Sequence, residues 1–281
     1  MSRRRDIGTD DPRVRVRPGR GSRPRTKRRP DYSGAPRGTV AQVLRGRYLV
    51  DCDDGTAVTA VKARTIPRGG VVIGDRVALT GDLSGKKDTL ARIVEVDERA
   101  TALRRSAEDG DLSGHERVMV ANADQLLIVT ALADPPPRIG MIDRCLVAAY
   151  DAGMRPILCL TKADLSDDSA VRAHYEPLDV TVVTTQISDD GALASTAEVS
   201  ALLAGHRTVL VGHSGVGKST LVNTLVPDAQ LRTGHVNEVT GRGRHTTTSA
   251  IAFDLPGGGI IIDTPGVRGF GLAHVEPDDV L

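Results

Sequence analysis

Residues 212–219 have the types and spacing of a phosphate-binding loop. They read Gly-His-Ser-Gly-Val-Gly-Lys-Ser and fit the pattern GxxxxGK[ST] throughout. The apolar run 207–211 before them predicts a strand, and the apolar spacing of 219–226 after them predicts a helix. Glycines let backbone N–H groups turn toward phosphate oxygens, and the N-terminus of the helix adds its dipole. We therefore expect these residues to bind the phosphates of a nucleotide.

The positions of this loop have different expected roles. The nucleotide-binding residues are Gly212, His213, Ser214, Gly215, Val216, Gly217, Lys218, Ser219 and Thr220. Lys218 is expected to reach the β- and γ-phosphates and to stabilise the charge that develops on them during reaction, whereas the Ser219 hydroxyl is expected to ligate magnesium. His213 occupies a variable position of the pattern, and its side chain is interpreted as incidental to the chemistry.

A second motif, DTPG, begins at Asp263 and follows another predicted strand. A carboxylate at a strand end suits a magnesium ligand that acts through a water molecule, and the backbone N–H of Gly266 suits the γ-phosphate. An ordinary strand-terminating turn is the alternative. The presence of the phosphate loop favours the first interpretation.

Between these motifs, residues 241–250 contain three consecutive threonines in a segment rich in Gly and Arg. A threonine hydroxyl could bind both magnesium and the γ-phosphate. We assign this role to Thr247, with Thr246 and Thr248 as alternatives. Such a loop is ordered only while the triphosphate is bound, which makes it a switch. Taken alone, the segment could also be a strand edge or a phosphorylation target.

Thr161, Lys162, Ala163 and Asp164 form the tetrapeptide [NT]KxD after a predicted buried strand. Asp164 can accept hydrogen bonds from the ring N–H and the exocyclic amino group of guanine, which adenine lacks. Lys162 would lie along the plane of the base. A carboxylate that adenine leaves unpaired discriminates strongly against it. We therefore expect these four residues to bind the base of GTP or GDP.

The base-reading motif precedes the phosphate loop, whereas in ordinary GTPases the phosphate loop opens the domain. A three-dimensional site does not depend on chain order when the same strands lie side by side. A circular permutation is therefore the simplest explanation. Thr184, Thr185 and Gln186 are then placed to form a second guanine-facing loop.

Two patterns of predicted elements position these motifs. Residues 38–99 contain about five short β-rich runs, which predicts a small barrel. The OB-fold, which often binds RNA, is the commonest class of this size, and an SH3-like or purely structural barrel is an alternative that periodicity alone does not separate from it. Residues 100–114 read as a linker. Residues 115–273 alternate buried strands with helices, as a parallel sheet flanked by helices does. The predicted fold is an α/β P-loop GTPase domain, circularly permuted, behind an all-β OB-fold-like barrel.

The composition is that of a globular chain, with 281 residues of which 40% are hydrophobic and 26% charged. No apolar run is long enough for a membrane span, and the N-terminus lacks a secretory signal. We therefore expect a cytoplasmic, monomeric protein with no membrane partner. Cys52, Cys145 and Cys159 have neither the number nor the spacing of a disulfide framework or a zinc site.

The formal net charge of +1 conceals an asymmetry between the N-terminus and the rest of the chain. Residues 1–30 hold eleven Arg and one Lys against three Asp, a net charge of +9, whereas the remainder has 25 basic and 33 acidic residues. A basic segment punctuated by Gly and Pro buries too little apolar surface to fold alone. We therefore expect residues 1–37 to form a disordered tail that binds RNA, with a solubilising or targeting tail as the alternative.

Taken together, TKAD, GHSGVGKST, GRGRHTTT and DTPGVRGFGL, in this order behind an OB-type barrel, resemble the RsgA/YjeQ family of circularly permuted, small ribosomal subunit biogenesis GTPases. The resemblance covers roughly residues 38–281. It implies GTP hydrolysis stimulated by the small (30S) ribosomal subunit and a role in the late maturation of that subunit. It also implies Mg²⁺ as the cofactor and contacts of the barrel with 16S rRNA.

The chain departs from the family at two places. Thr161 stands where many members have Asn, which leaves Asp164 to discriminate between bases, so we expect weaker binding with the guanine preference retained. Members of the family continue into a C-terminal zinc domain, whereas this sequence stops at VEPDDVL. We interpret residues 274–281 as the truncated start of such a domain and expect no zinc ligands in the chain as given.

One further role in hydrolysis is the orientation of the attacking water. Many GTPases place Gln directly after the DxxG motif, and this chain has Val267 there, which cannot orient water. His245, just before the threonines, is the nearest candidate for this catalytic role, and the resemblance points to the same residue. Its alternative is a surface histidine that contacts rRNA.

Two other classes of function compete with a GTPase. A P-loop kinase or ATPase would explain the phosphate loop but not the TKAD motif. An RNA-binding assembly factor with an inactive nucleotide site would explain the barrel and the basic tail. That second alternative predicts no turnover under any condition.

Overall fold

The computed structural model describes residues 31–44, 46–105, 117–188, 191–229 and 250–264. The expected residues His245, Thr247 and Gly266, and the basic tail up to residue 30, lie outside the described residues.

The first five strands form a closed barrel. They are β1 (Arg37–Leu44), β2 (Arg47–Cys52), β3 (Ala57–Lys62), β4 (Arg76–Gly81) and β5 (Ala91–Val96). Their order is β1-β2-β3-β5-β4, and β1 also pairs with β4, which closes the barrel. β3 and β5 are parallel, while the other pairs are antiparallel. This topology confirms the predicted OB-like barrel.

Alternate residues of these strands fill the barrel, as a pleated strand with one buried face requires. In β2, Tyr48, Val50 and Cys52 are buried, and Val50 is fully enclosed. The turn at residues 53–55 joins β2 to β3 and has Gly55 at φ +85°, which confirms the predicted hairpin.

A short antiparallel pair follows the barrel in the chain. β6 (Ala102–Arg105) pairs with β7 (Arg117–Ala121) and buries Leu103 together with Val120. β6 falls in the segment interpreted above as a linker. Four residues are too few for a strand periodicity to be visible in the sequence.

The remaining long strands form the α/β part of the molecule. They are β8 (Gln125–Ala131), β9 (Arg155–Thr161), β10 (Thr181–Thr184), β13 (Arg207–Val211), β14 (Ile251–Asp254) and β15 (Ile260–Asp263). They lie in the order β10-β9-β8-β13-β15-β14. All are parallel except β14, which is antiparallel to β15. Two short strands, β11 (Gln186–Ile187) and β12 (Leu193–Ala194), form a separate hairpin.

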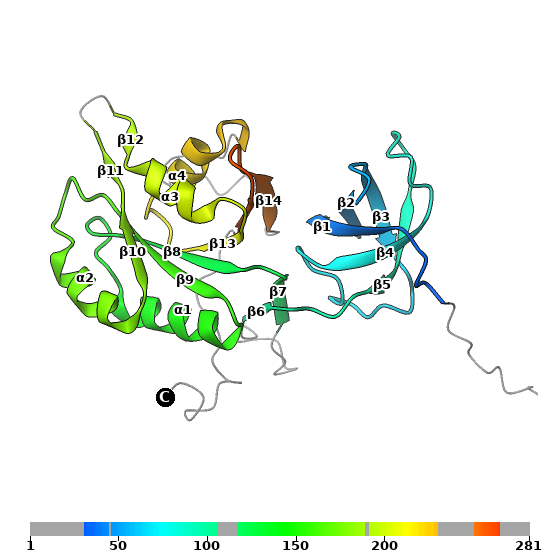
Figure 1. The fold of residues 1–281 in the computed structure, drawn as a ribbon, viewed down its shortest axis with the longest axis horizontal. Helices are drawn as coiled ribbons and strands as arrows, with labels where there is room; N and C mark the ends of the chain where they lie inside the picture. The colour runs from blue at the N-terminus through cyan, green and yellow to red at the C-terminus, as the bar shows by residue number, and fades with distance from the viewer. Residues whose placement is uncertain (1–30, 45, 106–116, 189–190, 230–249, 265–281) are drawn as a thin grey trace, which may run out of the picture. The chain divides into compact units, whose positions relative to one another are not determined.

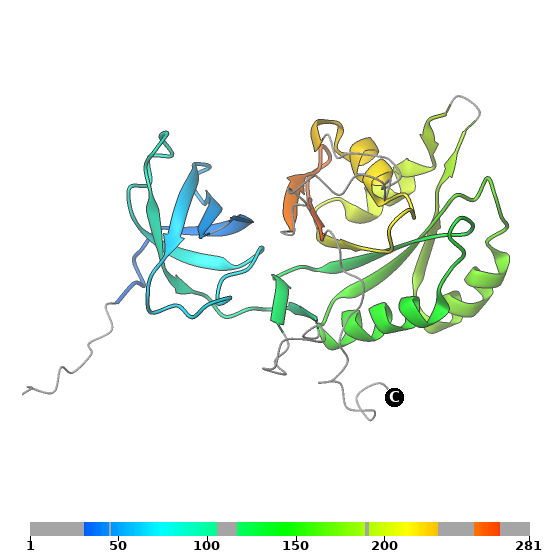
Figure 2. The same cartoon turned by 180° about the vertical axis from the view of Figure 1, so that it is seen from behind.

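Helices cover both faces of this sheet (Figures 1 and 2). They are α1 (Ile139–Asp151), α2 (Ser169–Tyr175), α3 (Thr196–Leu203) and α4 (Lys218–Leu225), with 3-10 turns at Glu176–Leu178 and Pro227–Ala229. In β8, Leu126 and Ile128 share a core with α1 and α2, whereas Leu127 and Val129 share a core with α3 and α4. The continuous apolar runs noted in the sequence are therefore strands buried on both faces.

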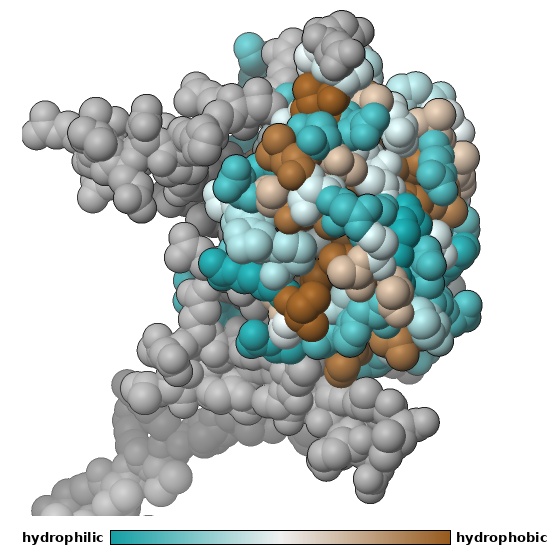
Figure 3. Space-filling model, turned by 90° about the vertical axis from the view of Figure 1, so that its left-hand side faces the viewer, coloured by the Kyte–Doolittle hydropathy of each residue, from teal (hydrophilic) through white to brown (hydrophobic). Residues whose placement is uncertain are grey.

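The outer surface is mixed in character. The face on the left-hand side of Figure 1, where α2 lies, shows hydrophilic and hydrophobic residues interspersed over its described part (Figure 3). No described helix is both long and apolar enough to cross a membrane.

The strand order confirms the circular permutation. β13 comes late in the chain, yet it lies between β8 and β15. Because β8, β9, β10, β13 and β15 are parallel, the loops that follow them leave the same edge of the sheet. Ile251, the first residue of β14, pairs with Asp263, the last residue of β15, so β14 begins at that edge as well.

Candidate nucleotide-binding site

The loop between β13 and α4 is held closely against β8. Gly212 has φ +155°, and a Cβ built on it would lie 2.2 Å from the Val129 carbonyl oxygen, so only glycine fits there. The Lys218 ammonium donates hydrogen bonds to the carbonyl oxygens of Gly212 (2.6 Å) and His213 (2.8 Å) across the loop. Ser219 and Thr220 follow Lys218 on the first turn of α4. The predicted phosphate loop thus has its strand before it and its helix after it.

Lys218 and Asp263 form the charged centre of this site. Burial lowers the pKa of Lys218, and the Asp263 carboxylate opposes that shift. Burial likewise raises the pKa of Asp263, and the Lys218 ammonium opposes that shift. Asp263 Oδ1 is buried and has no hydrogen-bond partner among the described residues. Buried polar atoms are normally satisfied, so this oxygen fits a site built to accept a group that binds from outside the chain.

Thr264 fixes the end of β15. Its buried hydroxyl donates a hydrogen bond to the Leu210 carbonyl oxygen of β13 at 2.6 Å. This side-chain bond adds to the parallel pairing, in which Leu210 lies beside Asp263. It therefore fixes the backbone next to Asp263 against the strand that leads into the phosphate loop.

Thr161 connects the base-reading motif to the phosphate loop. Its side chain is 3% exposed, and its hydroxyl lies 2.7 Å from the Val216 carbonyl oxygen and 3.3 Å from that of Thr130. The hydroxyl is therefore used inside the protein. Sequence reasoning placed Thr161 among the nucleotide-binding residues, and the structure gives its side chain a structural contact with the loop that would hold the phosphates.

The rest of the TKAD motif turns outward at the same edge. Lys162 has φ +59°, a conformation uncommon for a residue with a side chain, and its ammonium donates to the Asp134 carbonyl oxygen. Asp164 is exposed, and its carboxylate accepts a hydrogen bond from the Ile187 N–H at 3.1 Å. The Ala163 N–H donates to the Thr185 carbonyl oxygen at 3.3 Å. The structure thus brings TKAD and the 184–186 segment together, as the sequence predicted.

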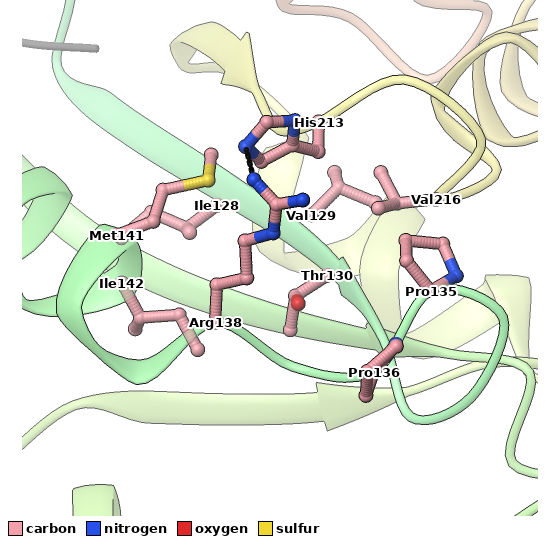
Figure 4. Close-up of a pocket in the computed structure, with 10 residues that line it drawn as sticks. All are labelled: Ile128, Val129, Thr130, Pro135, Pro136, Arg138, Met141, Ile142, His213 and Val216. Carbon is pink, nitrogen blue, oxygen red and sulfur yellow. Dashed lines mark hydrogen bonds between the residues drawn. The ribbon is translucent and has the colours of Figure 1, made fainter. Parts of the chain in front are cut away.

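His213 faces the start of α1. Its Nε2 lies 2.9 Å from Arg138 Nη1, within a small pocket that Pro135 and Met141 also line (Figure 4). The ring is therefore in contact with the segment after β8. Arg138 was not singled out from the sequence, where it follows three prolines and carries no motif.

A second group that sequence reasoning missed lies behind the base-reading loop. Asp168 and Arg172 form an ion pair at 2.6 Å across one turn of α2, and the hydroxyl of Thr184 joins them from β10. The i, i+4 spacing of an acid and a base is a local signal that could have revealed the ion pair. The threonine, twelve residues further on, carries no such signal.

Comparison with known proteins agrees with this geometry. The family model described as RsgA GTPase matches residues 96–273. The curated protein "Small ribosomal subunit biogenesis GTPase RsgA" of Chlorobaculum tepidum is 37% identical over 256 residues, which are 86% of this chain and 80% of that protein. The protein of the same name from Pseudomonas syringae pv. syringae is 42% identical over 216 residues, which are 75% of this chain and 60% of that protein.

Two solved structures share the fold. The crystal structure of YjeQ from Thermotoga maritima has a TM-score of 0.59 and 25% sequence identity, with 83% of this chain and 75% of that chain covered. The structure titled "YloQ, a circularly permuted GTPase" has a TM-score of 0.59 and 22% identity, with 87% and 76% covered.

The Thr161 hydroxyl is expected to stabilise the nucleotide-free protein. Thr161→Val keeps the shape of the side chain but leaves the buried Val216 carbonyl oxygen without this donor, so the free energy of unfolding should fall by about 1–2 kcal/mol. Urea denaturation without nucleotide measures this change. Thr161→Ser keeps the hydroxyl and should lose less. Equal stability of the valine variant and the unmodified protein would show that the contact contributes nothing.

Proposed function

The chain belongs to the RsgA GTPase family, and from this premise we propose that it acts in the biogenesis of the small ribosomal subunit, as the names of its curated relatives state for those proteins. It is a GTPase. The observation that carries the guanine-nucleotide site of this proposal is the hydrogen bond from Thr161 to Val216, which joins a guanine-type loop to a phosphate loop at one edge of the sheet.

The guanine end of the proposed site consists of the TKAD loop. Asp164 is exposed beside the 184–186 segment and can accept from the two N–H groups of guanine's edge. When a nucleotide binds, the Lys162 ammonium would either break its hydrogen bond to the Asp134 carbonyl oxygen or keep that bond and contact the base as well. Thr161 acts through its contact with Val216, and Ala163 through its backbone.

The phosphate end consists of residues 212–220. Lys218 is half-buried and donates to backbone carbonyl oxygens of its own loop, from which a triphosphate would take over its hydrogen bonds. A half-buried ammonium interacts more strongly with phosphate than an exposed one because less water screens it. Lys218 therefore stabilises the charge that develops on the transferred phosphoryl group.

Mg²⁺ fits the donor set next to Lys218. Hydroxyl and carboxylate oxygens are the ligands that Mg²⁺ prefers, and Asp263 Oδ1, which no described residue hydrogen-bonds, would be available to a water of its hydration shell. Ser219 and Thr247 would ligate the ion directly, with Thr246 and Thr248 as alternatives for the second. When bound, the ion neutralises charge on the β- and γ-phosphates.

His245 is the proposed water-orienting residue. It precedes Ile251 by six residues, and Ile251 pairs with Asp263 at the edge where the phosphate loop lies. An extended chain of six residues spans about 20 Å, which allows the imidazole to reach the γ-phosphate. The N–H of Gly266 would complete the contacts with that phosphate.

The proposed partner is the small ribosomal subunit with its 16S rRNA. Support comes from the OB-like barrel, a fold that often binds oligonucleotides, and from the net charge of +9 on residues 1–30. The subunit would stimulate hydrolysis by completing the site. A partner of this kind places the protein in the cytoplasm, where it would act as a monomer.

GTP turnover should be slow for the protein alone and rise about a hundredfold with purified small subunits, because a group that the subunit positions would complete the catalytic site. Phosphate release is the measurement, with ATP as the control substrate. Stimulation with GTP alone is the expected result. Equal turnover of GTP and ATP would contradict the guanine assignment, and the absence of stimulation would contradict the partner.

His245→Ala is expected to bind GTP normally and to lose subunit-stimulated turnover by about 10²–10⁴-fold, the usual contribution of a group that handles the proton of the nucleophile. Single-turnover hydrolysis with small subunits measures the loss. His206→Ala is the matched control, because His206 lies at the opposite end of β13, before Arg207. Full stimulated turnover of His245→Ala would remove this residue from the mechanism.

Asp164→Asn is expected to exchange guanine for xanthine. Xanthine has a carbonyl where guanine has its amino group, and the asparagine amide can donate to that oxygen. Affinity for GDP should fall about a hundredfold, because the asparagine NH2 would face the amino group of guanine and two donors would meet, while xanthosine diphosphate should bind more tightly than GDP. Calorimetric titration measures both, with ADP as the control. An unchanged preference for GDP would show that Asp164 does not contact the base.

A further inference from the structure

The side chain of Arg172 joins α2 to the end of β10. Its Nε donates to Asp168 Oδ2 at 2.6 Å, and its Nη2 donates to Thr184 Oγ1 at 2.6 Å. The Thr184 hydroxyl in turn donates to Asp168 Oδ2 at 2.8 Å, which closes a triangle of hydrogen bonds. Arg172 Nη1 also reaches Glu176 Oε1 at 3.0 Å and the Val182 carbonyl oxygen at 3.2 Å. We call Asp168, Arg172 and Thr184 the α2 clamp.

The clamp contains one positive and one negative side chain, Arg172 and Asp168, which form an ion pair. The hydrogen bond from Arg172, and next that from Thr184, lower the pKa of Asp168. The Asp168 and Arg172 side chains are 24% and 31% exposed, so each is partly shielded from water. Hydrogen bonds between charged partners are shorter and stronger than neutral ones, and several that share atoms hold their geometry better than one.

The clamp stands directly behind the base-reading loop. Asp168 is four residues beyond Asp164, and Thr184 is the last residue of β10, just before Thr185. The segment after Thr184 makes the contacts with TKAD, because the Thr185 carbonyl oxygen accepts from Ala163 and the Ile187 N–H donates to Asp164. The clamp therefore links the segment that follows Asp164 to the segment that follows β10, and contacts between these two segments hold the Asp164 carboxylate.

We propose that the α2 clamp is a positioning device that sets the orientation of the Asp164 carboxylate and thereby the discrimination between guanine and other purines. This inference rests on the proposed function, in which Asp164 reads the base. Asp164 is exposed, and Ile187 gives it one backbone hydrogen bond, so its geometry depends on where residues 185–187 lie. Two donors of guanine must meet one carboxylate at once, and a small misplacement weakens both hydrogen bonds.

The same pair of strands offers a matched control at its other end. Arg155 begins β9, and its Nη2 donates to the hydroxyl of Thr181, which begins β10, at 3.1 Å. This contact also links an arginine to a β10 threonine, but it lies at the edge away from TKAD. Thr181→Val and Thr184→Val thus remove equivalent hydroxyls at opposite ends of one short strand.

The test compares GDP with inosine diphosphate, which lacks the 2-amino group of guanine. Calorimetric titration of Thr184→Val should show GDP weakened by about tenfold and inosine diphosphate by about threefold, since a misplaced carboxylate loses more where it had two donors to accept. Thr181→Val should leave both dissociation constants unchanged. Equal weakening of the two nucleotides by Thr184→Val, or an unchanged GDP affinity, would overturn the proposal.

A second variant keeps the test decisive if Thr184→Val is unstable. Arg172→Lys retains the charge but not the planar fork that meets both partners, so it should lower the ratio of inosine diphosphate to GDP dissociation constants in the same direction. Thermal unfolding of each variant reports whether it folds. An unchanged ratio in a folded Arg172→Lys protein would also overturn the proposal.

The two hypotheses fail in different ways. If Asp164→Asn does not exchange guanine for xanthine, the assignment of Asp164 itself is wrong. If that exchange occurs and the clamp variants keep the full discrimination between GDP and inosine diphosphate, only the clamp is overturned.

Discussion

The parallel pairing of β13 with β8 on one side and β15 on the other is the constraint on which the site depends. Leu210 pairs with Leu127 of β8 and with Asp263 of β15, so three parallel chain segments lie side by side and run toward the same edge. β9 extends the same register beyond β8. Loops at the carboxyl ends of such strands converge whatever their order in the chain.

Two hydrogen bonds, from Thr161 to Val216 and from Thr264 to Leu210, then fix neighbouring loops to one another. A circular permutation preserves all of these contacts because it changes the connections and leaves the pairing alone.

The buried charges at this edge act against the stability of the nucleotide-free protein. Burial lowers the pKa of Lys218 and raises that of Asp263, so it disfavours the charged form of each group. Each charge partly relieves the other, yet Asp263 Oδ1 has no hydrogen-bond partner in the described part of the chain. Phosphates would pair with the ammonium, and a hydrated cation would pair with the carboxylate. The free energy that the nucleotide-free protein loses by burying these groups is therefore recovered when the ligand binds, which couples ligand binding to folding.

The sequence predicted the barrel, the permuted sheet and the two loops because each has a local signature. Fixed glycines, a lysine and a serine identify the phosphate loop, and alternation or apolar runs identify the strands.

The contacts that set the geometry of the site join residues far apart in the sequence, and this is why the sequence does not predict them. The buried hydroxyl of Thr161 was expected to lie near the nucleotide, since nothing in a tetrapeptide shows that a carbonyl 55 residues away accepts its proton. Thr184 was likewise expected to face the base, whereas its hydroxyl lies in the α2 clamp. The predicted roles of His245, Thr247 and Gly266 fall outside the described residues.

The permutation also has a mechanical consequence. Residues 241–250 lead into β14, and the DTPG motif begins at the last residue of β15, so the two segments proposed to contact the γ-phosphate are attached to the two strands of one hairpin at its open end. The turn of that hairpin is anchored, because the Gly205 N–H donates to the Gly258 carbonyl oxygen at 3.1 Å and the Ile260 N–H donates to that of His206 at 2.8 Å. A Cβ on Gly259 would lie 2.6 Å from the Leu203 carbonyl oxygen, which shows how closely the turn packs there. At the open end Ile251 pairs with Asp263, so the strand that follows residues 241–250 and the strand that leads into the DTPG motif are held side by side. A ligand that meets both proposed segments would therefore act on one end of a hairpin whose other end is anchored.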